Sequence, residues 1–311
     1  MKSGRHWADM GEWSFLWGMR FLFAVYRRCG GGWLPLFLYP VVSYYWLANS
    51  SARRASQDYL NRLVAFAPEL GLRADRWTSY RHFLAFAHAI IDKLAAWSGT
   101  LSLDKVEFEG RQRLLSQMQG GRGVVLLASH LGNPEVCRVI ASRDDAVKIN
   151  VLVHTRHAEK FNRLLREFNP NSGLNLLQVT EIDAAVAMRL AEKIDHGELI
   201  VIAADRTPVG GGRTTGVDFL GAAAALPQGP FVLAGLLQCP VFSLFCLKQQ
   251  DKYRVIFEPF AESLELPRAN RQQAIQAAAQ RYAARLGHYC RQAPLQWFNF
   301  YEFWSAASNR P

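Results

Sequence analysis

VVLLASHLGNPEVCR, residues 124–138, joins the pattern of a buried strand to a chemically active side chain. Its first six residues are apolar or small, as in a parallel strand that is covered on both faces. His130 follows directly, and Asn133 with Pro134 are residue types that begin helices. The stretch therefore predicts a strand, a short turn and a helix, with the histidine just beyond the strand.

Short apolar runs alternate with helical spacing from about Val106 onwards. The runs VVLLAS, VLV, LLQV and LIVIAA read as strands, and the helical stretches between them include AEKFNRLLREF and DAAVAMRLAEKI. GVDFLG, VFSLFCL and YRVIFEPF read as further strands, PQGP as a break, and residues from about Arg268 to Arg291 as a long helix. This alternation predicts an α/β fold, with a mostly parallel central sheet flanked by helices.

Composition narrows the class of protein. The chain has 311 residues, 50% of them hydrophobic, and a formal net charge of +10. That charge would suit nucleic acid, anionic lipid or an acidic carrier protein. No zinc finger, RNP-type motif or concentrated basic tract accompanies it, so nucleic acid is not an expected partner. The five cysteines lack C-x-x-C spacing and are expected to be free thiols.

The first 50 residues are predicted to attach the protein to a membrane. WSFLWGMRFLFAVYRR and GGWLPLFLYPVVSYYWLA are rich in aromatic residues and flanked by arginines, as at a lipid interface. Arg20 interrupts the first run, and Pro35 and Pro40 interrupt the second, so neither run reaches the ~20 residues of a bilayer crossing. We expect a membrane-seated helical segment over residues 1–50 and one α/β domain over 51–311; a buried helical pair is the alternative.

His130 and Glu135 are candidate catalytic residues. An imidazole near its ordinary pKa of ~6.5 can take a proton from an alcohol, and a carboxylate on its other nitrogen would fix the tautomer. The loop before the helix lets the histidine fold back toward Glu135. The spacing alone equally fits a solvated histidine and a helix-starting acid.

The whole constellation resembles the lysophospholipid-acyltransferase superfamily, and in particular the lipid A biosynthesis (late) acyltransferase family. The matching features are the H-x-x-x-x-E spacing, the aromatic N-terminus, the block ADRTPVGGGRTTGVDFLG and the aromatic ending QWFNFYEFW. The resemblance implies that His130 and Glu135 activate an acceptor hydroxyl to attack an acyl thioester. The Gly-Asn-Pro between the two residues and the ADR sequence depart from the family pattern and suggest a side branch, such as the acyltransferases of aryl-polyene clusters.

The resemblance also implies substrate-binding residues. Asp205 and Arg206 would face the same cleft as His130 and Glu135, with Arg206 binding a phosphate or a carrier phosphopantetheine. Phe219 and Gly221, with Leu220 and Pro227, would shape the acyl or acceptor pocket. Arg156 and Arg166 are both eligible for a basic residue of the middle region. A strand-end turn and a solvated helix face are the alternatives for these positions.

The resulting hypothesis is an acyltransferase on the cytoplasmic face of the inner membrane. It would move a fatty acyl group from acyl carrier protein, or else acyl-CoA, to a hydroxyl or amine of a lipid-like acceptor. No metal and no tightly bound cofactor are implied. The competing hypothesis is a non-catalytic, membrane-peripheral protein that binds lipid in the same cleft.

Overall fold

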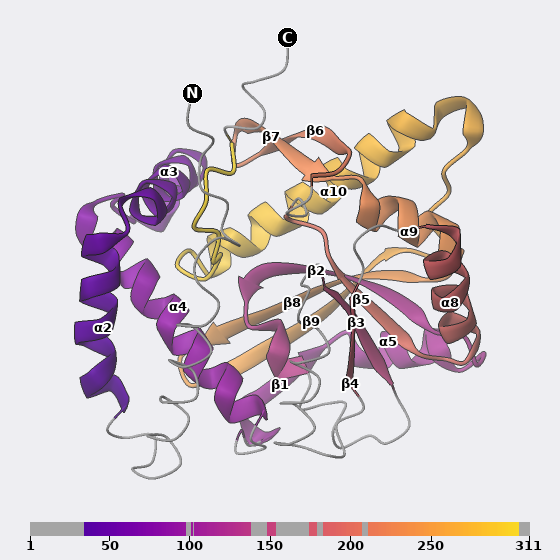
Figure 1. Cartoon of the computed structure of the whole chain (residues 1–311), viewed down its shortest axis with the longest axis horizontal. Helices are drawn as coiled ribbons and strands as arrows, with labels where there is room; N and C mark the ends of the chain where they lie inside the picture. The colour runs from indigo at the N-terminus through magenta and orange to yellow at the C-terminus, as the bar shows by residue number, and fades with distance from the viewer. Residues whose placement is uncertain are drawn as a thin grey trace.

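A seven-stranded sheet with the order β1-β9-β8-β2-β5-β3-β4 forms the centre of the molecule (Figure 1). The computed structural model describes residues 34–97, 101, 103–137, 148–153, 174–178, 183–206 and 211–304. All neighbouring strands of this sheet are parallel except β8 and β9. The predicted α/β class and mostly parallel sheet are therefore confirmed.

The strands have the following bounds. They are β1 Val106–Glu109, β2 Val124–Gly132, β3 Ile149–Val153, β4 Leu174–Gln178, β5 Leu199–Ala203, β6 Thr214–Phe219, β7 Ala222–Pro227, β8 Val241–Gln249 and β9 Lys252–Ala261. β6 and β7 form a separate antiparallel hairpin. The strand β7, with the sequence AAAALP, was not predicted, because alanine has a low strand propensity and only pairing with β6 selects the extended form.

The α-helices are α2 Leu34–Ala48, α3 Ser50–Phe66, α4 Arg76–Trp97, α5 Arg111–Met118, α8 Ala184–Asp195, α9 Gly229–Leu237 and α10 Arg271–Gln292. Short 3-10 turns lie at η2 Pro68–Leu70, η3 Leu103–Lys105, η4 Pro134–Cys137 and η5 Arg268–Asn270. The helix predicted from Pro134 is thus a 3-10 turn over its described residues. The long helix predicted from about Arg268 begins three residues later, after η5.

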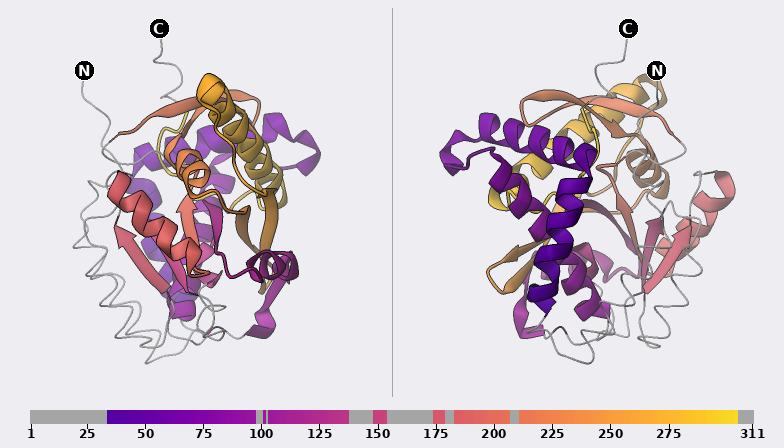
Figure 2. Two further views of the ribbon diagram at one scale, coloured as in Figure 1. Left: turned by 90° about the vertical axis from the view of Figure 1, so that its right-hand side faces the viewer. Right: turned by 60° about the vertical axis from the view of Figure 1, so that its left-hand side comes forward.

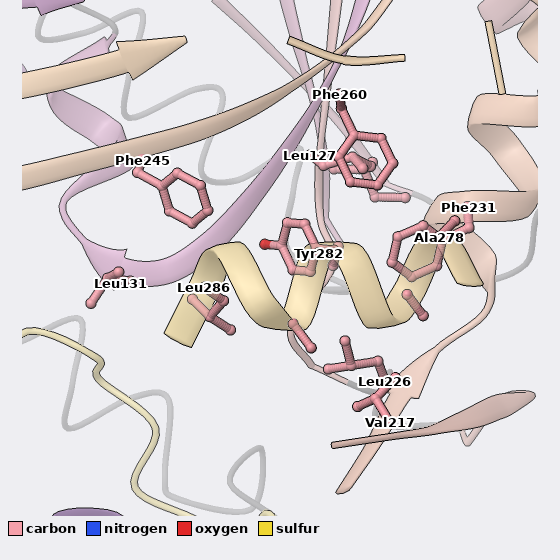
Figure 3. Close-up of a cluster of buried hydrophobic side chains, with 14 of the residues drawn as sticks. Leu127, Leu131, Val217, Leu226, Phe231, Phe245, Phe260, Ala278, Tyr282 and Leu286 are labelled. Carbon is pink, nitrogen blue, oxygen red and sulfur yellow. The ribbon is translucent and has the colours of Figure 1, made fainter. Parts of the chain in front are cut away.

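Both faces of the sheet are buried, as the continuous apolar run of β2 predicts. Val125 and Leu127 face a core that also contains residues of α3, α8, α9 and α10. Val124 and Leu126 face a second core, which includes Leu114 of α5. Figure 3 shows Tyr282 and Leu286 of α10 within the first core, near Leu127 and Leu131 of β2. Burying each such aliphatic side chain contributes about 1.5–3 kcal/mol.

The helices α2, α3 and α4 form a layer at one side of the sheet, which we call the helical layer (Figures 1 and 2). Leu38 and Val42 of α2 pack with Phe83 of α4 in a core of their own. Pro40 was expected to interrupt this apolar run, but α2 continues through it. One proline removes a single backbone donor, and packing of α2 against α4 can offset that loss.

The membrane-anchoring prediction for residues 1–50 falls largely on residues 1–33, which lie outside the described part of the chain. Among the described helices, none is both long enough and apolar enough to cross a bilayer.

The end of β2 leaves the regular ladder just where His130 lies. Ala128 pairs with Leu244 of β8, and the next partner of β8 is Gly132 with Cys246. Four steps along β2 therefore cover two steps along β8, and β2 bulges over residues 129–131. Gly132 closes the bulge with φ +73°, and a Cβ there would lie 1.8 Å from the carbonyl oxygen of Cys246. Within the bulge, the backbone N–H of His130 donates to the side chain of Asp205.

We expect Gly132→Ala to lower the free energy of unfolding by about 2–4 kcal/mol, because alanine is strained at positive φ and clashes with the backbone of β8. Urea unfolding followed by circular dichroism measures the change. Gly120→Ala is the matched control, since a Cβ at Gly120 meets nothing within 4 Å. Equal stability of the two variants would contradict this account of the bulge.

Candidate active site

His130 and Asp205 meet at the carboxyl ends of two neighbouring parallel strands. His130 lies in the final part of β2, and Asp205 follows β5 by two residues. β2 and β5 pair in parallel from Val124 with Leu199 to Ala128 with Ala203. In open α/β sheets, ligands bind at this edge of the sheet, where strand ends bring side chains from distant segments together.

The two residues form a close hydrogen-bonded pair. Nδ1 of His130 lies 2.8 Å from Oδ1 of Asp205, and the backbone N–H of His130 donates to Oδ2 of the same carboxylate at 2.8 Å. Asp205 has no exposed surface, whereas the His130 side chain is 36% exposed. Since Nδ1 is occupied by the buried carboxylate, Nε2 is the ring nitrogen that a substrate can reach.

The electrostatics keep Asp205 ionised and His130 a weak base. Burial raises the pKa of Asp205, but the charge and hydrogen bonds of His130, together with the Arg206 guanidinium, outweigh burial and hold it at about 2. Burial and then the charge of Arg206 lower the pKa of His130 below 6.5, and Asp205 acts in the opposite direction. At neutral pH the pair is therefore a neutral imidazole donating from Nδ1 to a carboxylate.

The C-terminal aromatic segment completes the site. Leu131 forms an antiparallel bridge with Trp297, and the N–H of Phe298 donates to the carbonyl of His130 at 3.0 Å. The indole N–H of Trp297 donates to Oδ2 of Asp205 at 3.0 Å. Residues close to the end of the chain thus pair with the tail of β2, an arrangement that the sequence pattern did not predict.

A second histidine, His82 of α4, forms a hydrogen bond with this segment. It is fully buried. Its Nε2 donates to the carbonyl of Trp297 at 3.0 Å, so Nδ1 accepts from the hydroxyl of Ser56 at 3.1 Å. The carbonyl accepts only, which fixes the tautomer of His82. Burial lowers the pKa of His82 to about 4, although the Trp297 carbonyl acts against this. His82 is therefore a neutral structural residue.

The remaining predicted site residues have varied positions. Arg206 is half-buried, donates to the carbonyl of Phe298, and lies with its guanidinium carbon 5.7 Å from the Tyr301 ring centre. Phe219 is buried against Trp297, at 5.1 Å between ring centres. Gly221 lies exposed in the turn between β6 and β7, with φ +71°.

Glu135 lies in η4, five residues after His130, and its side chain is outside the described part of the structure. Its pairing with His130 therefore stays a prediction. In the described geometry, Asp205 makes the Nδ1 contact that the motif suggested for Glu135. Arg156 and Arg166 also lie outside the described residues.

The thiols of Cys239, Cys246 and Cys290 are buried and form no disulfide within the described part of the chain, as predicted. Cys29 falls outside the described residues, as does the side chain of Cys137.

Residues 80–305 match the family model for bacterial lipid A biosynthesis acyltransferases. The chain belongs to this family. The match includes β2, β5 and the aromatic C-terminal segment, so it covers all three parts of the site. The family resemblance read from the sequence is thereby confirmed.

A curated relative is the phosphatidylinositol mannoside acyltransferase of Mycolicibacterium smegmatis (strain ATCC 700084 / mc(2)155). The two chains are 26% identical over 204 residues, which cover 66% of this chain. The aligned part spans 63% of the relative, less than two thirds of its length.

The buried His82 predicts a specific loss of stability in acid. Its folded pKa of about 4 lies below the ordinary 6.5, so the unfolded chain binds a proton at His82 that the folded protein does not bind. The free energy of unfolding should fall by about 3 kcal/mol from this residue as the pH decreases from 6.5 to 4. Urea unfolding at several pH values measures the slope.

His82→Gln keeps a donor toward Trp297 but removes the titration, so its stability should depend less steeply on pH. His196→Gln, at the exposed C-terminal end of α8, is the control and should keep the wild-type slope. Identical slopes for His82→Gln and wild type would show that folding does not lower the pKa of His82.

Proposed function

We propose that this protein transfers a fatty acyl group from acyl carrier protein, or from acyl-CoA, to a hydroxyl or amine of a lipid-like acceptor, with His130 as the general base. The observation that carries the proposal is the contact of Nδ1 of His130 with the buried carboxylate of Asp205, which leaves Nε2 toward the substrate. Membership of an acyltransferase family supports it, as does the named activity of the mycobacterial relative.

The chemistry is a direct acyl transfer. Nε2 of His130 removes the proton of the acceptor hydroxyl while the oxygen attacks the thioester carbonyl. The tetrahedral intermediate then collapses, the C–S bond breaks, and the imidazolium returns the proton to the departing thiolate. Asp205 holds the ring and stabilises its positive charge in the intermediate. The lowered pKa of His130 keeps the base neutral at physiological pH.

The positive groups suit the donor. Arg206 lies beside the His130–Asp205 pair, near enough to lower the pKa of His130. It binds the phosphate of the donor or of the acceptor. Arg156 and Arg166 are the two candidates for a further basic residue of the substrate site. A net charge of +10 attracts the acidic carrier protein, which is why the carrier ranks above coenzyme A as the donor.

Phe219 and Gly221 belong to the β6–β7 hairpin and shape the acyl or acceptor pocket. Phe219 does so by packing against Trp297, and Gly221 lies at the exposed turn. Glu135 supports the imidazolium electrostatically, while Asp205 orients it.

We expect His130→Ala to lower the rate of acyl transfer by about 10²-fold or more, because the reaction loses its general base. Asp205→Asn should lower it strongly as well, since an amide cannot stabilise the imidazolium. Acyl transfer from radiolabelled acyl carrier protein to extracted membrane lipid measures the rate. His196→Ala is the control, because this histidine lies on α8 at an exposed position.

Turnover by His130→Ala within a few-fold of the wild type would contradict the mechanism and favour a non-catalytic lipid-binding protein. Glu135→Gln separates the roles of the two acids. A loss for Asp205→Asn much larger than that for Glu135→Gln assigns the orienting role to Asp205, and the reverse order assigns it to Glu135.

The outer face of α2 supports attachment to the cytoplasmic face of the inner membrane. While Leu38 and Val42 pack inward, Tyr39, Val41, Tyr44 and Leu47 are exposed, Tyr44 by 75%. Figure 2 shows α2 at the outside of the helical layer. Arg53 donates to the carbonyls of Trp46 and Leu47 and lies over the Trp46 ring, which places a cation beside this apolar face. Apolar and aromatic residues next to cations are typical of anionic lipid interfaces.

The double variant Tyr44→Glu with Leu47→Glu should bind vesicles of phosphatidylethanolamine and phosphatidylglycerol about ten-fold or more weakly, because it places two charges in the interface. Co-sedimentation measures the binding. Met188→Glu is the control, since Met188 is 74% exposed on α8, on the opposite side of the molecule from α2 in Figure 1. Unchanged binding by the double variant would show that another part of the chain contacts the lipid.

A further inference from the structure

Within the described residues, the carboxylate of Asp205 has three N–H donors, and one of them belongs to no predicted site residue. Two come from His130, through its backbone and its Nδ1. The third is the indole N–H of Trp297, which donates to Oδ2 at 3.0 Å. Trp297 has no exposed surface, so it cannot touch a substrate directly. Its indole N–H can therefore act on the reaction only through Asp205.

The indole N–H is fixed in space on every side. The Trp297 ring lies 5.0 Å from the rings of Tyr59 and Phe303 and 5.1 Å from that of Phe219, between ring centres. Its backbone pairs with Leu131, and its carbonyl accepts from the buried ring of His82. A donor held this firmly keeps the geometry of its acceptor at little further cost in entropy.

The donors divide between the two carboxylate oxygens. The backbone N–H of His130 and the indole of Trp297 both donate to Oδ2, and Nδ1 of His130 contacts Oδ1 alone. Tilting the carboxylate out of its present plane would break the indole bond, because the indole has a single N–H with one fixed direction. The indole therefore favours the direction of the carboxylate in which one oxygen accepts from the indole and the backbone and the other oxygen faces Nδ1 of His130.

We propose that Trp297 is a positioning residue for the reaction, whose indole N–H holds the Asp205 carboxylate in the orientation that keeps His130 as its Nδ1–H tautomer. This inference rests on the proposed function and adds a third residue to the His130–Asp205 pair. It also gives the aromatic C-terminal segment a chemical role besides packing.

Two substitutions separate the hydrogen bond from the packing. Trp297→Phe removes the N–H and keeps an aromatic ring, and Trp304→Phe is the matched control. Trp304 lies 5.9 Å from Trp297 between ring centres and is also buried, but its indole N–H has no hydrogen-bond acceptor among the described residues. Both variants replace an indole of the same aromatic cluster by a smaller phenyl ring. The difference between them therefore measures the effect of the Trp297–Asp205 hydrogen bond.

We expect Trp297→Phe to lower kcat by about ten-fold relative to Trp304→Phe, with the KM for the acyl donor within about two-fold, because the lost bond acts on the base and not on binding. Among the described residues, the charged groups that act on His130 are Asp205, Arg206 and Lys93; the proposed contribution of Glu135 is unchanged in both variants. Asp205 raises the pKa of His130, so weakening its contact should move the acid limb of the pH profile to lower pH. In ¹⁵N-histidine NMR, the Nδ1–H tautomer of His130 should lose population.

If Trp297→Phe matches Trp304→Phe in kcat, in the acid limb and in the tautomer, Trp297 only packs and the inference is wrong. If the Phe variant fails to fold, a benzothiophene side chain at position 297 replaces the N–H by sulfur within the same shape. The tautomer measurement needs no turnover. Its failure therefore differs from failure of the proposed function, in which the wild-type protein transfers no acyl group.

Discussion

The buried carboxylate of Asp205 is the constraint on which the rest of the site depends. An ionised carboxylate without exposed surface loses several kcal/mol of hydration free energy unless donors replace the water. Here three N–H groups replace it, from the backbone and ring of His130 and from the indole of Trp297. Satisfying that one charge therefore requires β2, β5 and the C-terminal segment to meet at a single point.

The surrounding structure follows from that requirement. The bulge at the end of β2 turns His130 toward Asp205, and Gly132 permits the bulge because no side chain fits beside the backbone of β8. Tyr282 of α10 and the N–H of Ala204 both donate to the carbonyl of Ala128, which fixes the strand ends two residues before His130. His82 fixes Trp297 from the helical layer. The packing on both faces of the sheet thus holds the imidazole of His130 in one orientation.

The same helical layer links the site to the apolar outer face of α2. Trp46 of α2 donates to the hydroxyl of Ser79, which lies 3.0 Å from that of Ser56, and Ser56 contacts His82. A largely buried chain of hydrogen bonds therefore runs from α2 to Trp297. The helical layer that carries the exposed apolar face of α2 therefore also contacts the segment that completes the His130–Asp205 site.

The sequence by itself determined most of the elements and marked His130 as the candidate base. The buried-strand pattern of residues 124–128, the alternation after it and the position of His130 beyond the strand follow from local periodicity, which short-range sterics and burial dictate. The family blocks also marked Asp205, but not as the partner of His130 Nδ1. Only the tertiary structure decided that pairing, because 75 residues separate His130 from Asp205 and strand order, not spacing, makes β2 and β5 neighbours. The role of Trp297 was hidden for the same reason, since a hydrogen bond over 92 residues leaves no local pattern.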